Sequence, residues 1–326
     1  MTTDRKLELV VVPDDSPPVL HGTHLEPRAR ALAREVRFYF DRPLEPDVLL
    51  ERIRDAEAVI NIRATSKFTR HVLEACPRLK LVSVWGVGVD NIDLAAATRL
   101  GITVSNTPGY ASIGVAEHAL TLALSVARQI ITNDRLIRSG SWSRGWLVQL
   151  YGKTLGVVGA GPIGQRMVEL GRGVGMKVVA WTRKPTPERA RQLGVEFLPL
   201  EELLRQSDVV SLHLPLTDET RGLLNRERLA LMKPTAILVN TGRGPLIDEA
   251  ALTDALREKR LAGAGLDVFA TEPLPKGHPL TTLDNVVLSP HAAQASPETT
   301  LRGVEMSIEN IESFLRGQPI RVVNPQ

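Results

Sequence analysis

Short apolar runs rich in β-branched residues alternate with amphipathic stretches along almost the whole chain. Near the amino terminus, the runs that predict strands are Leu7–Val12, Ala58–Ile62, Leu79–Trp85 and Thr103–Ser105. The stretches between them predict helices, among them Arg28–Arg37 and Pro46–Asp55. Strands separated by helix-length segments are typical of βαβ units, so the pattern predicts an α/β fold with parallel sheets.

A second series of the same kind follows Ala111–Gln129, a long helix that is apolar on most faces and is therefore expected to be buried. The strands predicted after it are Leu155–Val158, Lys177–Trp181, Val209–His213, Ala236–Asn240, Gly263–Asp267 and Val286–Leu288. Helices are expected to begin near Pro162, Pro187, Asn225 and Asp248. The Trp-containing segment Ser141–Gly152 shows no pattern that predicts an element.

The last periodic segment, Pro297–Arg316, predicts a helix that stops at Gly317 with Pro319 beyond it. Because this helix follows a complete second α/β series, we expect it to return to the first one. A chain of 326 residues is long enough for two domains at about 100–200 residues each. We therefore expect residues 1–103 with 295–326 to form one domain and residues 104–294 to form the other.

The composition of the chain excludes several classes of function. The chain is 43% hydrophobic and 24% charged, and its net charge of +3 is spread along the sequence, which argues against nucleic-acid binding. The sequence shows no apolar run long enough to span a membrane and no signal peptide. A cytoplasmic protein is therefore expected. Cys76 is the only cysteine and is interpreted as an inert thiol. With no thiolate cluster and no H-E-x-x-H motif, the sequence predicts no metal site.

The stretch GAGPIG is a G-x-G-x-x-G motif placed between a predicted strand and a predicted helix. In this context Gly159 allows the tight turn, Gly161 lets a pyrophosphate approach the backbone, and Gly164 lets the helix pack on the strand. Pro162 and Ile163 open the helix, whose free N–H groups attract phosphate. The motif predicts a dinucleotide-binding domain over residues 104–294.

The strand after this motif lacks the acid that usually binds the adenosine ribose of NAD. It ends instead in Thr182, Arg183 and Lys184, and the only acid between Gln165 and Pro187 is Glu169, inside the helix. Cations at this point attract a 2′-phosphate, which predicts that NADP(H) is preferred and NAD(H) is tolerated. The alternative is that both cations are solvated loop charges and the protein uses either cofactor.

Candidate catalytic residues follow three later strands: Arg243, then Asp267 and Glu272, then His291. Strand ends of a parallel sheet meet at one edge, so these loops are expected to converge on one ligand. An arginine can bind a carboxylate, a histidine can protonate a carbonyl oxygen, and a glutamate can orient the histidine. That set suits the reduction of a small 2-oxo acid. His213 also ends a strand, and with Pro215 it is interpreted as lining the cofactor cleft and not as the acid.

The chain resembles the D-isomer-specific 2-hydroxyacid dehydrogenase family over essentially its whole length. The stretches that carry the resemblance are VWGVGVDNIDL, NTPGYASIGVAEHAL, GAGPIG, SDVVSLHLPLT, MKPTAILVNTGRGPLIDEAAL, AGAGLDVFATEPLP and NVVLSPHAA. The family implies a Rossmann-type doubly wound nucleotide domain inserted in a smaller flavodoxin-like α/β substrate domain. It also implies an active site in the interdomain cleft and a homodimer held largely by the nucleotide domain.

The resemblance also implies roles for single residues. Arg243 matches the arginine that engages the substrate, and Glu272 matches the glutamate paired with the catalytic histidine, His291. Asp267 matches the acid that contacts the nicotinamide amide. The backbone of Gly86, Val87 and Gly88 matches the loop that receives the substrate carboxylate, and Thr241 and Pro215 match cofactor contacts.

Departures from the family pattern bear on the substrate. The missing ribose acid resembles the NADPH-using glyoxylate and hydroxypyruvate reductases, which also carry basic residues after that strand. Val87 stands where phosphite dehydrogenases carry lysine, which weighs against that activity. The histidine loop, PHAAQAS, lacks the more frequent glycine. Two alternatives stay open: an NAD-dependent dehydrogenase of a bulkier D-2-hydroxy acid, and a non-catalytic dinucleotide-sensing protein like the corepressors that share this fold.

Overall fold

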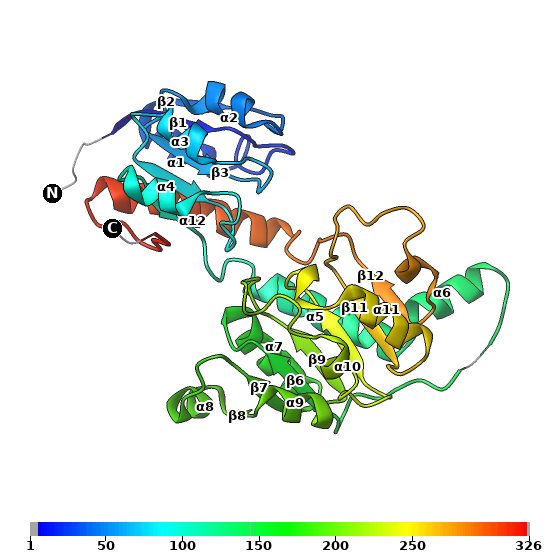
Figure 1. Ribbon diagram of the computed structural model, residues 1–326. Coiled ribbons are helices and arrows are strands. Elements are labelled where there is room, and N and C mark those ends of the chain that lie inside the picture. Colours follow the sequence, from blue (N-terminus) through cyan, green and yellow to red (C-terminus); the bar gives the residue numbers. More distant parts are fainter. Residues whose placement is uncertain (1–5, 144, 325–326) are drawn as a thin grey trace. The chain divides into compact units, whose positions relative to one another are not determined.

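The chain folds into two compact α/β units. A computed structural model describes residues 6–143 and 145–324 and divides the chain into Met1–Ala111 with Ser296–Gln326, and Ser112–Ala295 (Figure 1). The first boundary lies about eight residues later than the sequence suggests, because the chain stays bound to the first unit after β5 (Thr103–Ser105). There Asn106 Nδ2 donates to Val87 O at 2.8 Å, and Thr107 N donates to Gly86 O at 2.9 Å.

The first unit is built on a five-stranded parallel sheet in the order β2-β1-β3-β4-β5. This order is the flavodoxin-like one. Its other strands are β1 (Leu7–Val12), β2 (Ala33–Phe38), β3 (Ala58–Asn61) and β4 (Leu81–Val84). The helices of the unit are α1 (Glu26–Arg30), α2 (Pro46–Ile53), α3 (Arg70–Glu74), α4 (Leu94–Arg99) and α12 (Pro297–Leu315). Buried side chains of α12, such as Val304 and Ile308, join one of the two apolar clusters of this unit, which explains why the last helix returns to it.

The prediction of a helix over Arg28–Arg37 is wrong. Helix α1 ends at Arg30, and β2 then pairs with β1 in parallel as the edge strand of the sheet. Glu35 and Arg37 alternate with inward-facing residues along this edge, and Arg37 Nε donates to Glu35 Oε1 at 2.5 Å. Charged residues are common on edge strands, where they discourage pairing with other chains. Here their spacing in the sequence resembles that of the polar face of an amphipathic helix.

The second unit is built on a seven-stranded parallel sheet in the order β12-β11-β10-β9-β6-β7-β8. Counted from β6, the order is the 3-2-1-4-5-6 of a Rossmann fold extended by one strand. The strands are β6 (Thr154–Val158), β7 (Lys177–Trp181), β8 (Glu196–Phe197), β9 (Val209–Leu212), β10 (Ile237–Asn240), β11 (Gly263–Leu266) and β12 (Val286–Leu288). The α-helices are α5 (Ser112–Ala127), α6 (Ile130–Arg138), α7 (Pro162–Gly173), α8 (Pro187–Leu193), α9 (Leu200–Gln206), α10 (Arg226–Leu229) and α11 (Glu249–Arg257), and 3₁₀ turns span Gly244–Leu246 and Pro279–Thr282.

Helix α5 packs directly on β11, which explains the glycines of that strand. A Cβ atom on Gly263 would lie 2.6 Å from Val126 Cγ1, and one on Gly265 would lie 2.7 Å from Leu122 Cβ. The alternating glycines therefore let the helix approach the strand. This contact buries the apolar helix as the sequence predicts, although α5 ends at Ala127, and Gln129 takes φ +50° before α6 begins.

Cys76 is buried in the first unit, with 2% of its surface exposed. Burial raises the pKa of its thiol to about 11, so the side chain stays protonated and unreactive at neutral pH. Within residues 6–143 and 145–324, no helix has the length and apolarity needed to cross a membrane.

Candidate active site

The glycine-rich turn after β6 has the geometry that a bound pyrophosphate requires. Gly159 has φ +107°, and a Cβ atom there would lie 2.6 Å from His213 O. A Cβ on Gly164 would overlap Gly159 O, so α7 could not start so close to the strand with any larger residue. A Cβ on Gly161 would meet no atom within 4 Å, which leaves its backbone open to a ligand at the start of α7.

The tip of β7, where the ribose end of a dinucleotide is expected, carries cations. Arg183 forms an ion pair with Glu219, an acid in the loop after β9. Arg189 of α8 donates to Thr182 Oγ1 at 3.3 Å, to Lys184 O at 2.7 Å and to Ala160 O at 3.2 Å. This arginine therefore links the strand tip to the glycine-rich turn. Arg189 is not among the residues predicted from the sequence, although the cations that follow residue 182 indicate an anion-binding site at this strand tip.

Two buried polar atoms at the ends of β9 and β10 lack a hydrogen-bond partner in the described part of the chain: His213 Nδ1 and Thr241 Oγ1. Burial lowers the pKa of His213 to about 4, so its imidazole is neutral at pH 7. The other ring nitrogen, Nε2, lies 2.9 Å from Ser211 Oγ. Nearby, Pro215 O accepts from Thr220 Oγ1 at 2.7 Å. Unpaired buried polar atoms beside an open glycine turn fit a polar ligand such as a dinucleotide.

Arg243 follows β10 in a loop shaped by Asn240. The Asn240 side chain donates to Arg243 O and accepts from Gly242 N, both at 3.0 Å. A Cβ on Gly244 would overlap the backbone of Phe269, so this loop is in contact with the segment after β11. The Arg243 guanidinium donates to Gly242 O at 2.8 Å, and no carboxylate of the described residues pairs with it. Arg243 is therefore available to bind an anion.

His291 and Glu272 form a hydrogen-bonded pair. Nδ1 of His291 lies 2.7 Å from Glu272 Oε2, and Glu272 Oε1 accepts from Phe269 N at 3.0 Å. The carboxylate holds the proton on Nδ1 and orients the ring, which leaves Nε2 to exchange a proton with a ligand. The side chains are 40% and 34% exposed, so a ligand can reach the pair. The histidine and glutamate predicted from the sequence are therefore in direct contact.

Asp267 directly follows β11 and is fully buried. Its carboxylate accepts from Ala292 N at 2.9 Å and from Ala293 N at 3.0 Å. Burial opposes ionisation, but hydrogen bonds from His118, Ser289 and these two N–H groups outweigh it and lower the pKa of Asp267. The structure therefore ties Asp267 to the His291 loop, a contact that the sequence did not predict.

The loop Gly86–Gly88 of the first unit follows β4. The N–H of Gly86 donates to Thr107 Oγ1 at 2.8 Å, so one of the three expected amide donors is already used. In the described residues no hydrogen bond is donated by the N–H groups of Val87 and Gly88, and the Val87 side chain is 49% exposed. Val87 and Gly88 are thus the amides left to receive an anion.

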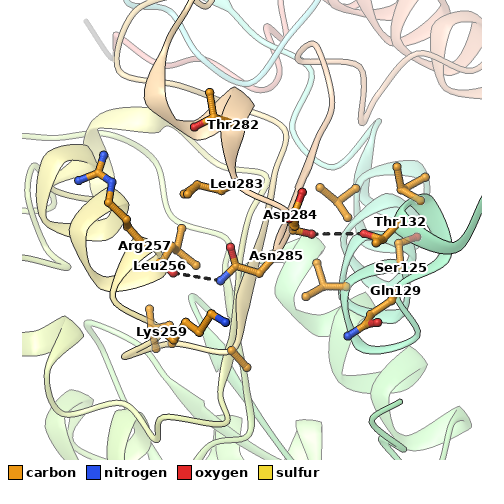
Figure 2. A pocket seen from close by; sticks show the side chains of 15 residues that line it. Ser125, Gln129, Thr132, Leu256, Arg257, Lys259, Thr282, Leu283, Asp284 and Asn285 are labelled. Atoms are coloured by element: carbon orange, nitrogen blue, oxygen red, sulfur yellow. Dashed lines mark hydrogen bonds between the residues drawn. The ribbon is translucent and has the colours of Figure 1, made fainter. Parts of the chain in front are cut away.

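A cavity of about 570 Å³ lies elsewhere in the second unit (Figure 2). It is lined by the ends of α5 and α11, by α6, and by Ala262 and Asn285, which immediately precede β11 and β12. Figure 2 shows Thr132 Oγ1 donating to Asp284 O and Asn285 Nδ2 donating to Leu256 O across its wall. The cavity thus lies at the amino edge of the sheet and contains none of the candidate site residues. Among the described residues no cluster of His, Cys, Asp and Glu could hold a metal ion.

Comparison with known proteins decides the family. Residues 120–293 match the family model described as D-isomer specific 2-hydroxyacid dehydrogenase, NAD binding domain. The chain belongs to the D-isomer-specific 2-hydroxyacid dehydrogenases. The resemblance seen in the sequence motifs is therefore confirmed, as is the two-domain Rossmann-type α/β fold.

Relatives of this family cover most of the chain. A glyoxylate reductase from Aeropyrum pernix is 46% identical over 293 residues, which are 87% of each chain. The structure of an acyclic imino acid reductase in complex with NADPH and D-arginine is 31% identical, has a TM-score of 0.87, and covers 97% of this chain and 99% of its own. A D-lactate dehydrogenase from Aquifex aeolicus, complexed with NAD and lactic acid, is 29% identical with a TM-score of 0.84, and covers 98% of this chain and 100% of its own. As a member of this D-2-hydroxyacid dehydrogenase family, the protein is an NAD(P)-dependent oxidoreductase.

Proposed function

We propose that this dehydrogenase reduces a small 2-oxo acid, such as glyoxylate or hydroxypyruvate, to the D-2-hydroxy acid and prefers NADPH over NADH. The observation that carries the proposal is the His291–Glu272 pair, with Nδ1 and Oε2 2.7 Å apart, in a unit that also presents Arg243, which has no carboxylate partner among the described residues. The glyoxylate reductase from Aeropyrum pernix, at 46% identity, supports the substrate class.

A bound nicotinamide cofactor would supply the hydride that reduces the C2 carbonyl carbon. His291, charged by a proton on each ring nitrogen, gives the Nε2 proton to the carbonyl oxygen, so that C=O becomes CH–OH. Glu272 stabilises the imidazolium before that transfer and keeps Nδ1 protonated after it. Arg243 binds the carboxylate and polarises the carbonyl. In the first unit, the N–H groups of Val87 and Gly88 are proposed as donors to an anion.

The polar atoms at the strand ends are proposed to hold the dinucleotide. The open backbone of Gly161 and the start of α7 receive the pyrophosphate, with Ile163 and Pro162 in the first turn. His213 Nδ1 and Thr241 Oγ1, which have no partner among the described residues, are proposed to face the cofactor. Pro215, three residues after β9, is proposed to line the same end of the sheet.

A substrate panel tests the proposed reaction. Purified protein is mixed with NADPH or NADH and a series of 2-oxo acids of increasing side-chain size, and kcat/KM is measured for each pair from the loss of reduced cofactor. We expect the highest value for glyoxylate or hydroxypyruvate with NADPH. A maximum with NADH and a branched or aromatic 2-oxo acid would favour the alternative of a dehydrogenase for bulkier substrates. Tight dinucleotide binding with no turnover would favour the binding protein.

Gly161 provides a test of the cofactor site that does not depend on turnover. In the Gly161→Val variant the new side chain occupies open space where the pyrophosphate is proposed to lie. Since Gly161 has φ −77°, valine fits the backbone, and we expect a loss of stability of no more than about 1–2 kcal/mol from the altered helix cap. The dissociation constant for dinucleotide, measured by calorimetry, should rise at least about tenfold, equal to about 1.4 kcal/mol. An unchanged dissociation constant would contradict the placement.

Helix α6 and the segment after it are proposed to form the homodimer interface. Helix α6 has no buried residue, and Ile130 and Ile137 are 55% and 53% exposed. Trp142 and Trp146 are 79% and 98% exposed. Figure 1 shows α6 at the margin of the second unit, beside the strand β12. Exposed apolar surface of this extent marks an interaction site, and a second copy of the chain is the proposed occupant.

Sedimentation tests the dimer. The wild-type protein is expected at twice its chain mass of 35.7 kDa. An Ile130→Lys/Ile137→Lys double variant should sediment at 35.7 kDa, because lysines at a packed interface would be buried without partners. Leu44→Lys, which changes a leucine that is 66% exposed in the first unit, is the control and should stay dimeric. A wild-type monomer at micromolar concentration would contradict the proposal.

A further inference from the structure

The loop that carries His291 is hydrogen-bonded to Asp267, a fully buried residue. Asp267 accepts from the N–H groups of Ala292 and Ala293, and its own carbonyl oxygen accepts from His291 N at 2.8 Å. His291 itself has φ +52°, a left-handed conformation that costs conformational energy in any residue except glycine. These bonds together impose the turn that aims the imidazole at Glu272.

A second histidine contacts that carboxylate. His118 lies on α5, and its Nε2 is 3.4 Å from Asp267 Oδ1 and 3.0 Å from Ser289 Oγ. The Ser289 hydroxyl helps to lower the pKa of Asp267, and Ser289 lies two residues before His291. A buried carboxylate must be surrounded by donors to remain ionised. His118 and Ser289 complete that set, and neither has a role in the reduction described above.

We propose that His118 is a positioning residue for the reaction: it braces Asp267, with Ser289, and through Asp267 it fixes the left-handed turn that aligns His291 with Glu272. The proposal rests on the proposed function for its kinetic consequence, because it assigns His291 the proton transfer. The connection itself is structural and can be tested without turnover.

Substitutions at His118 separate its hydrogen bond from its volume. His118→Phe keeps a ring of similar size and removes the donor, whereas His118→Gln keeps an N–H donor at a similar reach. We expect His118→Phe to lower kcat by roughly 10- to 100-fold, the loss that follows removal of a hydrogen bond to an ionised group. The dinucleotide KM should change by less than about threefold, because the effect lies in the transition state. His118→Gln should recover most of the lost kcat.

The matched control is Thr121→Val on the same helix. Among the described residues Thr121 Oγ1 donates to Glu117 O alone, within α5, so this variant should keep the wild-type kcat. Should His118→Phe fail to fold, Ser289→Ala removes the second donor to Asp267 without changing α5 and is expected to lower kcat in the same way.

Hydrogen–deuterium exchange of the peptide spanning residues 289–295 gives the readout that does not need activity. In His118→Phe the amides of Ala292 and Ala293 should exchange faster than in the wild type, and in His118→Gln they should exchange at close to the wild-type rate. If the wild-type protein reduces no 2-oxo acid, the proposed function fails. The exchange measurement still tests whether His118 stabilises the loop through Asp267. Unchanged exchange in both His118→Phe and Ser289→Ala would overturn the inference, as would an unchanged kcat in an active enzyme.

Discussion

Replacing His291 with asparagine is expected to lower kcat for 2-oxo acid reduction by about 10²- to 10⁴-fold, the range that general acid catalysis contributes. The variant loses an imidazole that is oriented by a carboxylate 2.7 Å away and is still open to a ligand. Binding of the dinucleotide should be nearly unchanged, because the proposed cofactor contacts lie on other loops. Stopped-flow measurement of cofactor oxidation separates the two effects.

A matched control exists in the same unit. His278 Nε2 lies 3.3 Å from Glu249 Oε1, so it is a second histidine–glutamate pair with no proposed role in catalysis. His278→Asn should keep kcat near the wild-type value, whereas Glu272→Gln should lower it, since the neutral amide no longer stabilises the imidazolium. A His291→Asn variant with the wild-type kcat would show that another group supplies the proton.

Replacing Arg183 and Lys184 together with alanine is expected to raise KM for NADPH by roughly 10- to 100-fold, which corresponds to the loss of charge-assisted hydrogen bonds to a 2′-phosphate. KM for NADH should change by less than about threefold, because NADH has no phosphate there. The structure adds a further variant: Glu219 pairs with Arg183, so Glu219→Gln should free the guanidinium and lower KM for NADPH.

Arg191→Ala is the control for this experiment, since Arg191 is an exposed cation of α8 a few residues away. It should leave both KM values unchanged. Equal increases in KM for NADPH and NADH in the Arg183→Ala/Lys184→Ala variant would contradict a role in reading the phosphate. Arg189→Ala is expected to raise KM for both cofactors, because this residue also hydrogen-bonds Ala160 O in the glycine-rich turn.

The fold could be predicted wherever a strand lies inside a sheet. Strands such as β9 and β10 are buried on both faces and are therefore continuous apolar runs, which the pattern identifies directly. Two of the four edge strands, β5 and β12, match predicted apolar runs, and the other two were not predicted. Strand β2 carries alternating charges that resemble a helix, and β8 has only two residues. Helix α6 has no buried face, so periodicity gave no signal for it.

The candidate site could be predicted from residues that follow strands in short motifs, but not from contacts between distant segments. Arg243, Glu272 and His291 stand at three successive strand ends, and the parallel sheet accounts for their convergence. His118 and Ser289 are 171 residues apart and meet only because α5 packs beside β11 and β12. The pairing of Arg183 with Glu219 likewise depends on loops from β7 and β9, which are not neighbours in the sheet.

The most direct test of the central claim is the rate of NADPH oxidation by the wild-type protein with glyoxylate or hydroxypyruvate, measured beside His291→Asn. The account predicts a wild-type kcat/KM of at least about 10⁴ M⁻¹s⁻¹, within the usual range for enzymes, and a loss of at least about 100-fold in the variant. Oxidation of neither NADPH nor NADH with any 2-oxo acid of a broad panel, or equal rates for the two proteins, would contradict it.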